Sequence, residues 1–431
     1  MKVDPTKLYL QSTGIVPNVI DTPLQKPSSK QTYPLYQGKI LNVEPSHLWL
    51  KRLGESTPSP IAALLKEKIR NEILLDKNDP AFPDKLIETW QKYGFAVVLD
   101  KNLNSHAVQE TYKTMKVFFA QDPVYKSKLG SPGANNNDGY IPPDTEVSVS
   151  AIGNSGEAQK SANVFEMVHR NTSGKNRDID DDLGKTFKTL TDNLVGMLYG
   201  QAKGIARAVS VGLSNKGFLT PDGKELDENY FINLMKDDRG KVDDLNLMRL
   251  THCKAFSLEE ANTFSCTLAH TDLNFFTILP TANREGLQIW YEDFDSPENS
   301  GWVQLDAPKD SYIVNLADEA DILTRGYLRS TPHRVISPLG EDRYSIVFFV
   351  NFKRDVDLQK AKLFHPVYVG SSRFEQESVP RINGQNLTAA NFANLRIMDI
   401  GLIPKDVGRD KLNFIPIEDL EYMKSQVEQS S

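Results

Sequence analysis

His270 and Asp272 stand two positions apart in the stretch TLAHTDL, which has apolar residues on both sides. If this stretch is a strand, both side chains point the same way, because side chains alternate along a strand. An imidazole and a carboxylate on one buried face cost free energy unless something offsets their lost hydration, and a divalent cation would do so. An ordinary hydrogen-bonded pair is the alternative, since one His-x-Asp can also arise by chance.

A second imidazole could complete the group. His333 begins another stretch that reads as a strand, and the chain after His270 is long enough to return to a facing strand. Two histidines and one carboxylate on one side of a metal, with other positions open, are typical of non-haem Fe(II) oxygenase sites. Zinc is the alternative for these ligands, commonly in a closed or four-coordinate arrangement. We expect His270, Asp272 and His333 to bind one metal ion.

Arg343 and Ser345 open the strand-like run RYSIVFFV. They share a face with Val347 and Phe349, so a guanidinium points toward an apolar interior. Arginine is rarely buried without an anionic partner, and its fork of N–H donors matches a carboxylate. We expect an anion clamp here, with a structural salt bridge to a core Asp or Glu as the alternative.

Taken together, these motifs resemble the Fe(II)/2-oxoglutarate-dependent dioxygenases of the isopenicillin N synthase-like family. Other segments in the same order are similar to that family: IETWQKYGFAVVL with the later FFAQDP, GLQIW, WVQLDAPKDSYIVNLAD and TRGYLRSTPHRV. The resemblance covers roughly residues 83–355.

The resemblance implies that His270, Asp272 and His333 hold Fe(II), and that Arg343 and Ser345 hold the distal carboxylate of 2-oxoglutarate. O2 would be consumed, succinate and CO2 released, and a small organic molecule hydroxylated, desaturated or cyclised. Two alternatives remain: an iron oxidase of the same fold that does not use 2-oxoglutarate, and a binding protein that has lost turnover.

Three features depart from the family pattern. Thr251 and Cys253 stand where many members carry Asn-x-Tyr, so one expected co-substrate contact is missing. The spacing between the two histidines is long, and we place the excess in the loop EDFDSPENSG. Arg325 replaces the Asn of a TNG-like motif, and we expect it to face solvent.

The elements that must position these residues follow from periodicity. Apolar residues at helical spacing predict helices at 83–93, from Ser105 onward and at 181–211, and the run 95–99 reads as a buried strand. We interpret the polar segment 213–243 as an insertion and expect a helix at 388–398. From about 245 the period becomes two, which predicts strands at 245–255, 263–279, 286–291, 302–305, 311–315 and 343–352.

Many short strands separated by turns favour a sandwich or jelly roll. We therefore expect an α+β fold: a double-stranded β-helix (jelly-roll) core with flanking helices. The expected division is a Pro-rich extension at 1–80, one oxygenase domain at 81–355, with its main strands at 245–355, and a C-terminal extension at 356–431.

The remaining candidates have ordinary interpretations. Tyr140 and Phe165 fall where the family's substrate pocket is lined, but core packing is the favoured role. His252 alternates away from its two neighbours. The other histidines are expected in loops or on helix surfaces: His47, His106, His169 and His365.

Composition limits the class of protein. The 431 residues carry 50 Lys+Arg against 57 Asp+Glu, a net charge of −7, which argues against binding to nucleic acid or to an anionic membrane. No run is long and apolar enough to cross a bilayer. Two cysteines allow no disulfide framework, so we expect a cytoplasmic protein with reduced thiols.

Overall fold

The computed structural model describes residues 68–399, apart from 102, 104, 131–137, 144–164, 173–175, 236–245, 258–265, 294–299, 306, 337, 383 and 385. Its helices are α4 (Phe82–Tyr93), α5 (Ser105–Phe119), α6 (Pro123–Ser127), α7 (Asp182–Asn215), α8 (Tyr230–Leu234), α10 (Asp318–Leu323), α11 (Arg373–Ser378), the 3-10 turn η3 (Val379–Ile382) and α12 (Ala389–Asp399). Within the described part of the chain, no helix combines the length and the apolar character needed to span a membrane.

Helix ends follow local chemistry. The carboxylate of Asp181 accepts a hydrogen bond from the N–H of Gly184 and so caps α7. The helix α4 ends at Gly94, whose φ of 67° lies in the left-handed region that glycine adopts without strain. This sharp end lets the chain turn directly into β2 (Phe95–Leu99).

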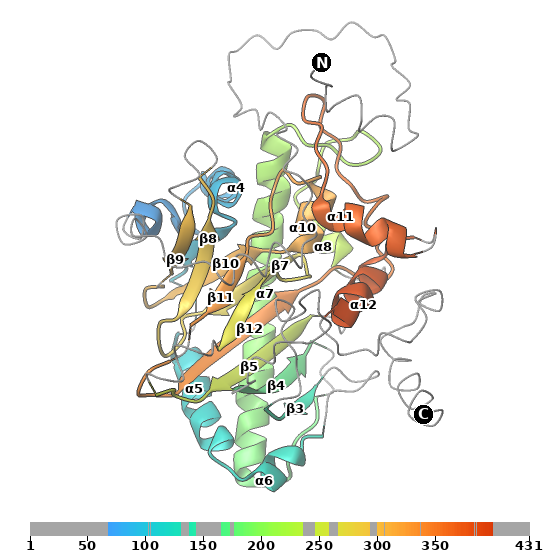
Figure 1. The fold of residues 1–431 in the computed structure, drawn as a ribbon. Coiled ribbons are helices and arrows are strands. Elements are labelled where there is room, and N and C mark those ends of the chain that lie inside the picture. The colour runs from blue at the N-terminus through green and yellow to red at the C-terminus, as the bar shows by residue number, and fades with distance from the viewer. Residues whose placement is uncertain are drawn as a thin grey trace, which may run out of the picture. The chain divides into compact units, whose positions relative to one another are not determined.

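Two sheets form the jelly roll (Figure 1). The large sheet has the order β1-β2-β10-β7-β12-β5-β4-β3 and the small sheet the order β6-β11-β8-β9. The remaining strands are β1 (Leu74–Asp76), β3 (Gly139–Ile141), β4 (Phe165–Asn171), β5 (Leu247–Cys253), β6 (Thr267–His270), β7 (Phe276–Pro280), β8 (Leu287–Tyr291), β9 (Gly301–Gln304), β10 (Ser311–Leu316), β11 (His333–Val335) and β12 (Arg343–Val350).

The two faces of the large sheet have different partners. Ile346, Phe348 and Val350 of β12 are fully buried in one core with residues of α4, α5 and α7. Alternate residues of β12 point to the opposite face, which bears Arg343 and Ser345. We call this second face of the large sheet, which bears Arg343 and Ser345, the inner face.

The expected fold class is confirmed, and so are the helices at 83–93, from Ser105, at 181–211 and at 388–398. The expected strand at 263–279 is wrong as one element: it is β6 and β7 with a turn between them. The interpretation of 213–243 as an insertion is also wrong, because Phe218, Phe231 and Met235 are buried in the core against α7 and the large sheet.

The domain boundaries stay a prediction, and the structure adds two observations to them. β1 pairs in parallel with β2, so the large sheet begins before residue 80. The described C-terminal residues contribute Leu358, Phe374 and Phe392 to the main core. Segments expected as extensions therefore pack with the jelly roll.

Candidate metal centre

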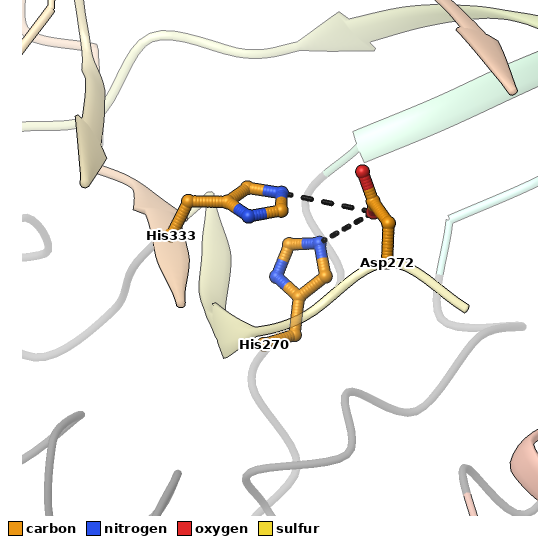
Figure 2. A group of neighbouring side chains, drawn as sticks. All are labelled: His270, Asp272 and His333. Carbon is orange, nitrogen blue, oxygen red and sulfur yellow. Dashed lines mark ion pairs between the residues drawn. The ribbon is translucent and has the colours of Figure 1, made fainter. Parts of the chain in front are cut away.

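His270, Asp272 and His333 converge at one end of the small sheet (Figure 2). His270 and His333 are directly paired across β6 and β11, and their ring centroids lie 4.3 Å apart. The Asp272 Oδ1 lies 3.6 Å from His270 Nε2 and 3.7 Å from His333 Nε2. One ligand atom from each residue lies within 4.8 Å of the others.

The route to this arrangement differs from the expectation in two respects. The strand β6 ends at His270, so Asp272 belongs to the turn before β7, and strand alternation does not explain its orientation. His333 lies on the neighbouring strand of the same sheet and not on a facing one.

Two hydrogen bonds fix the Asp272 carboxylate. Thr277 Oγ1 donates to Asp272 Oδ2 at 2.7 Å, and Asn315 Nδ2 donates to the same oxygen at 2.8 Å. Oδ1 is thereby directed at the imidazoles. Burial raises the pKa of Asp272, but the two imidazoles and these two donors outweigh burial, so its pKa lies below the usual value.

The tautomer of His333 follows from its other contact. Its Nδ1 lies 3.3 Å from the carbonyl oxygen of Thr331, which can only accept, so Nδ1 carries the proton and Nε2 presents a lone pair. The ring packs edge-on against Phe95, with centroids 5.6 Å apart.

This donor set fits a divalent metal ion. With metal–ligand bonds of about 2.1 Å, neighbouring ligand atoms lie roughly 3.0–3.4 Å apart, depending on geometry. The separations of 3.6 and 3.7 Å need only small side-chain shifts to reach that range. Three ligands from one side leave the remaining coordination positions open to other molecules.

Arg343 lies on the inner face at the start of β12 and is 5% exposed. Its Nη1 donates to Ser345 Oγ at 3.0 Å, and its Nε has no hydrogen-bond partner among the described residues. No ion pair joins Arg343 to a carboxylate within that same part of the chain, which argues against the structural salt bridge. A buried guanidinium with a hydroxyl beside it can therefore bind an anion.

Arg343 also faces the strand next to the metal group. A Cβ placed on Gly286 would lie 3.5 Å from Arg343 Nε, and Gly286 immediately precedes β8. Ile289 lies on β8, three residues after Gly286, and pairs with His333 of β11. The guanidinium and the three converging residues thus belong to one region between the two sheets.

Two of the residues that depart from the family pattern, Thr251 and Cys253, lie on the inner face beside Arg343. Thr251 pairs with Ser345 and Cys253 with Arg343, so both face inward as expected. Arg325 does not simply face solvent: its side chain is half-buried, and its Nε donates to the carbonyl of Leu363.

Tyr140 is buried and donates to the carboxylate of Glu166, which agrees with a packing role. Phe165 is half-buried against the cluster of Cys253, Phe256 and Cys266. His252 points away from the inner face and stacks on Tyr344, as its alternation predicted.

The expectation for His169 is wrong, because it lies in β4, where it is 6% exposed. His106 is exposed on α5 and His365 lies in a loop, as expected, whereas His47 falls outside the described residues. β4 was not foreseen, since much of the chain before it has no apolar alternation.

Several supporting residues escaped prediction from sequence. Thr277 and Asn315 carry common polar side chains, and only the strand register brings them to Asp272. Arg396 of α12 reaches Thr271, the residue between the first two candidate ligands. The sequence around Arg396 gives no signal for this contact.

Residues 247–352 match the family model described as "2OG-Fe(II) oxygenase superfamily", and this range contains all five candidate residues. Among curated proteins, the 2-oxoglutarate-dependent dioxygenase citB of Monascus ruber is 38% identical over 91 residues, 21% of this chain and 26% of that protein. Azadirone synthase LFS of Melia azedarach is 26% identical over 257 residues, 60% of this chain and 73% of that protein.

Solved structures show the same fold. A full-length protein of Neurospora crassa, solved in complex with alpha-KG, aligns with a TM-score of 0.56 and 19% identity, covering 75% of this chain and 95% of that chain. A 2OG-Fe(II) oxygenase family protein from Caulobacter crescentus aligns with a TM-score of 0.55 and 22% identity, covering 76% and 98%. The chain spans about a quarter of the length of the first curated relatives it matches.

Proposed function

We propose that the protein is an Fe(II)- and 2-oxoglutarate-dependent dioxygenase that oxidises a small organic molecule, because residues 247–352 match the model of the 2OG-Fe(II) oxygenase superfamily. The observation that carries this proposal is the convergence of His270, Asp272 and His333 in the same inter-sheet region as a buried arginine without a described carboxylate partner. Iron chemistry and keto-acid binding need both features together.

In this proposal, bound Fe(II) and 2-oxoglutarate supply the oxidation, in which O2 and 2-oxoglutarate are consumed and succinate and CO2 are released. His270 Nε2, His333 Nε2 and Asp272 Oδ1 are the three protein ligands. Thr277 and Asn315 hold the other Asp272 oxygen and keep Oδ1 directed at the ion. Arg343 and Ser345 bind the distal carboxylate of the co-substrate.

Apolar side chains flank the candidate ligands on one side. Phe95 covers one edge of His333, and the neighbouring strands contribute apolar residues such as Ile289 and Val303. An apolar wall beside the ion favours oxidation of the bound substrate over side reactions. Hydroxylation, desaturation and ring closure are all compatible with these residues.

We also propose a cytoplasmic location, since Cys253 and Cys266 are free, buried thiols in a chain with no other cysteine.

The decisive experiment measures succinate release from purified protein with Fe(II), 2-oxoglutarate and O2, with each component omitted in turn. We expect slow release without substrate, dependent on all three, and none in His333→Ala. An absence of succinate in every condition, with correctly folded wild type, would contradict the proposal and favour a binding protein.

The missing Asn-x-Tyr motif at Thr251 and Cys253 favours one second candidate, an iron oxidase that does not use 2-oxoglutarate. Titration of 2-oxoglutarate into anaerobic Fe(II) protein separates the two. A metal-to-ligand charge-transfer band supports the dioxygenase, whereas no spectral change supports the oxidase.

A further inference from the structure

A second arginine occupies the inner face of the large sheet. Arg249 on β5 pairs with Val347 on β12, four residues from Cys253, which pairs with Arg343. Strand geometry places the backbones of Arg249 and Cys253 roughly 13 Å apart. The two arginines therefore stand at different positions along the same face.

The Arg249 side chain leans toward the candidate metal ligands. Its guanidinium carbon lies 5.2 Å from the ring centroid of Phe349. Phe349 pairs with Thr277 of β7, and Thr277 donates to Asp272. Because β5 and β7 lie on either side of β12, with neighbouring strands about 4.8 Å apart, the backbones of Arg249 and Thr277 lie roughly 10–12 Å apart, which a guanidinium and a small ligand together can span.

This part of the inner face is reached by solvent, although it lies in the middle of the sheet. Arg249, Val347 and Phe349 are all half-buried. Their neighbours Met248 and Phe348, whose side chains point to the other face of the sheet, are fully buried against the helices. The Arg249, Val347 and Phe349 side chains are therefore accessible to a small molecule. Val347 and Phe349 place apolar side chains beside the Arg249 cation.

His169 orients this cation. Arg249 Nε donates to His169 Nε2 at 3.1 Å, so Nε2 is the acceptor and the proton of the neutral ring is on Nδ1. Burial, with a smaller contribution from the Arg249 charge, holds the pKa of His169 well below its usual value, which keeps the ring neutral. His169 is 6% exposed, and its Nδ1 has no hydrogen-bond partner in the described part of the chain.

We propose that Arg249 binds a carboxylate of the substrate, so that the oxidised molecule is a small, largely apolar carboxylic acid, and that His169 positions the guanidinium. This proposal rests on the proposed oxygenase function. Two separate arginines then hold two separate carboxylates: Arg343 the co-substrate, Arg249 the substrate. Phe349 and Val347 contact the apolar part, which leaves the substrate C–H bonds near the metal.

The test uses acetate, hexanoate, benzoate and 1-naphthoate, each beside its neutral primary amide, in ligand-observed NMR titrations with and without 2-oxoglutarate. The variants are Arg249→Met, Arg249→Lys and His169→Leu, with Arg207→Met as the matched control, since Arg207 is exposed on α7. Affinity for 2-oxoglutarate is measured on every variant, and melting temperatures report folding.

We expect the larger acids to bind wild type about 10–100-fold more tightly than their amides, because a charge-assisted hydrogen bond discriminates by that factor. Arg249→Met abolishes the preference and leaves 2-oxoglutarate affinity unchanged, Arg249→Lys retains part of it, and Arg207→Met retains all of it. His169→Leu weakens the preference for acids without changing the binding of the amides.

Three outcomes would overturn the proposal: equal binding of acids and amides, no binding of any acid at about 10 mM, or loss of 2-oxoglutarate affinity in Arg249→Met, which would assign Arg249 to the co-substrate. Failure of the oxygenase proposal is seen separately, as absence of 2-oxoglutarate binding to wild type.

Discussion

Arg396 of α12 donates a hydrogen bond of 3.3 Å to the hydroxyl of Thr271, the residue that separates His270 from Asp272. The same guanidinium lies 3.1 Å from the Asp318 carboxylate, and the N–H of Asp318 donates to the carbonyl of Asp272. Arg396 and Asp318 are almost completely buried. A helix far along the chain is therefore tied to the segment that carries two candidate metal ligands.

Replacing Arg396 by Met should destabilise the protein and weaken metal binding together. Burial raises the pKa of Asp318 to about 7 even beside Arg396, so the carboxyl left behind should take up a proton, and the loss of stability should stay below the ~3–5 kcal/mol expected for a buried charge left unpaired. Denaturant unfolding and metal titration measure the two effects. The double variant Arg396→Met with Asp318→Asn should recover stability but not full metal affinity, and full recovery of both would show that Arg396 does not order the ligand segment.

Thr277→Val should lower metal affinity, with a loss of stability of about 1–3 kcal/mol, because the buried hydroxyl also accepts a hydrogen bond from Asn274. Valine keeps the shape of the side chain but removes the donor to Asp272 Oδ2, and loss of such a supporting contact typically costs 10–100-fold in affinity. Competition with a chromogenic chelator measures the dissociation constant. Thr281→Val is the matched control, since Thr281 lies just beyond β7 and donates to carbonyls of Pro308 and Ser311.

Arg343→Met should weaken 2-oxoglutarate binding about 100-fold or more. Arg343→Lys should reduce the affinity by a smaller factor, because lysine keeps the positive charge but cannot form the bidentate contact with a carboxylate. Ser345→Ala removes the hydroxyl that accepts a hydrogen bond from the guanidinium and should lower 2-oxoglutarate affinity roughly tenfold. Isothermal titration with 2-oxoglutarate and with succinate checks these values. Unchanged affinity in Arg343→Met would place the co-substrate elsewhere.

The sequence predicted what depends on local pattern. The strands β8, β10 and β12 follow from alternation or apolar runs, and α4 from its apolar stripe and the Gly94 that ends it. His270, Asp272 and His333 could be singled out because imidazole and carboxylate groups in apolar segments need a partner that offsets their lost hydration. Their assignment as metal ligands remains a prediction, and the structure supports it by bringing the three together.

What could not be predicted depends on long-range register. Asn315 is an ordinary polar residue until β10 pairs with β7 and brings it to Asp272. Similarly, Arg249 and His169 meet only because β4 pairs with β5, and β4 itself gave no clear signal. The burial of Phe231 within a polar segment depends on the position of α7 and carries no local signature.

Gly94→Ala should destabilise the protein by several kcal/mol. Alanine is strained at a φ of 67°, and its Cβ would overlap the side chain of Thr331, which is tied to the strand of His333. The melting temperature should fall by more than in Gly223→Ala, where φ is also positive but no atom lies within 4 Å. Equal losses in the two variants would assign the cost to the backbone alone.

The stability of the protein in acid depends on Glu166, which lies behind the inner face. Lys126 Nζ donates to its Oε2 at 2.6 Å, Tyr140 donates to the same oxygen at 2.5 Å, and His252 Nδ1 lies 2.9 Å from its Oε1. Burial raises the pKa of Glu166, but these partners outweigh burial and lower it to about 2. Folding therefore favours the ionised carboxylate of Glu166 over its protonated form.

A lowered pKa in the folded state stabilises the protein above the unfolded value of 4.5, and the contribution is lost as the pH falls from there toward 2. The shift corresponds to at most about 3 kcal/mol. Glu166→Gln should thus be less stable at pH 7 by an amount of this order, and its disadvantage should shrink below pH 4.5. Denaturant unfolding of both proteins at several pH values, with the exposed Glu228→Gln as control, measures this difference. A constant difference between about pH 7 and about pH 3 would mean that the Glu166 charge does not contribute to stability.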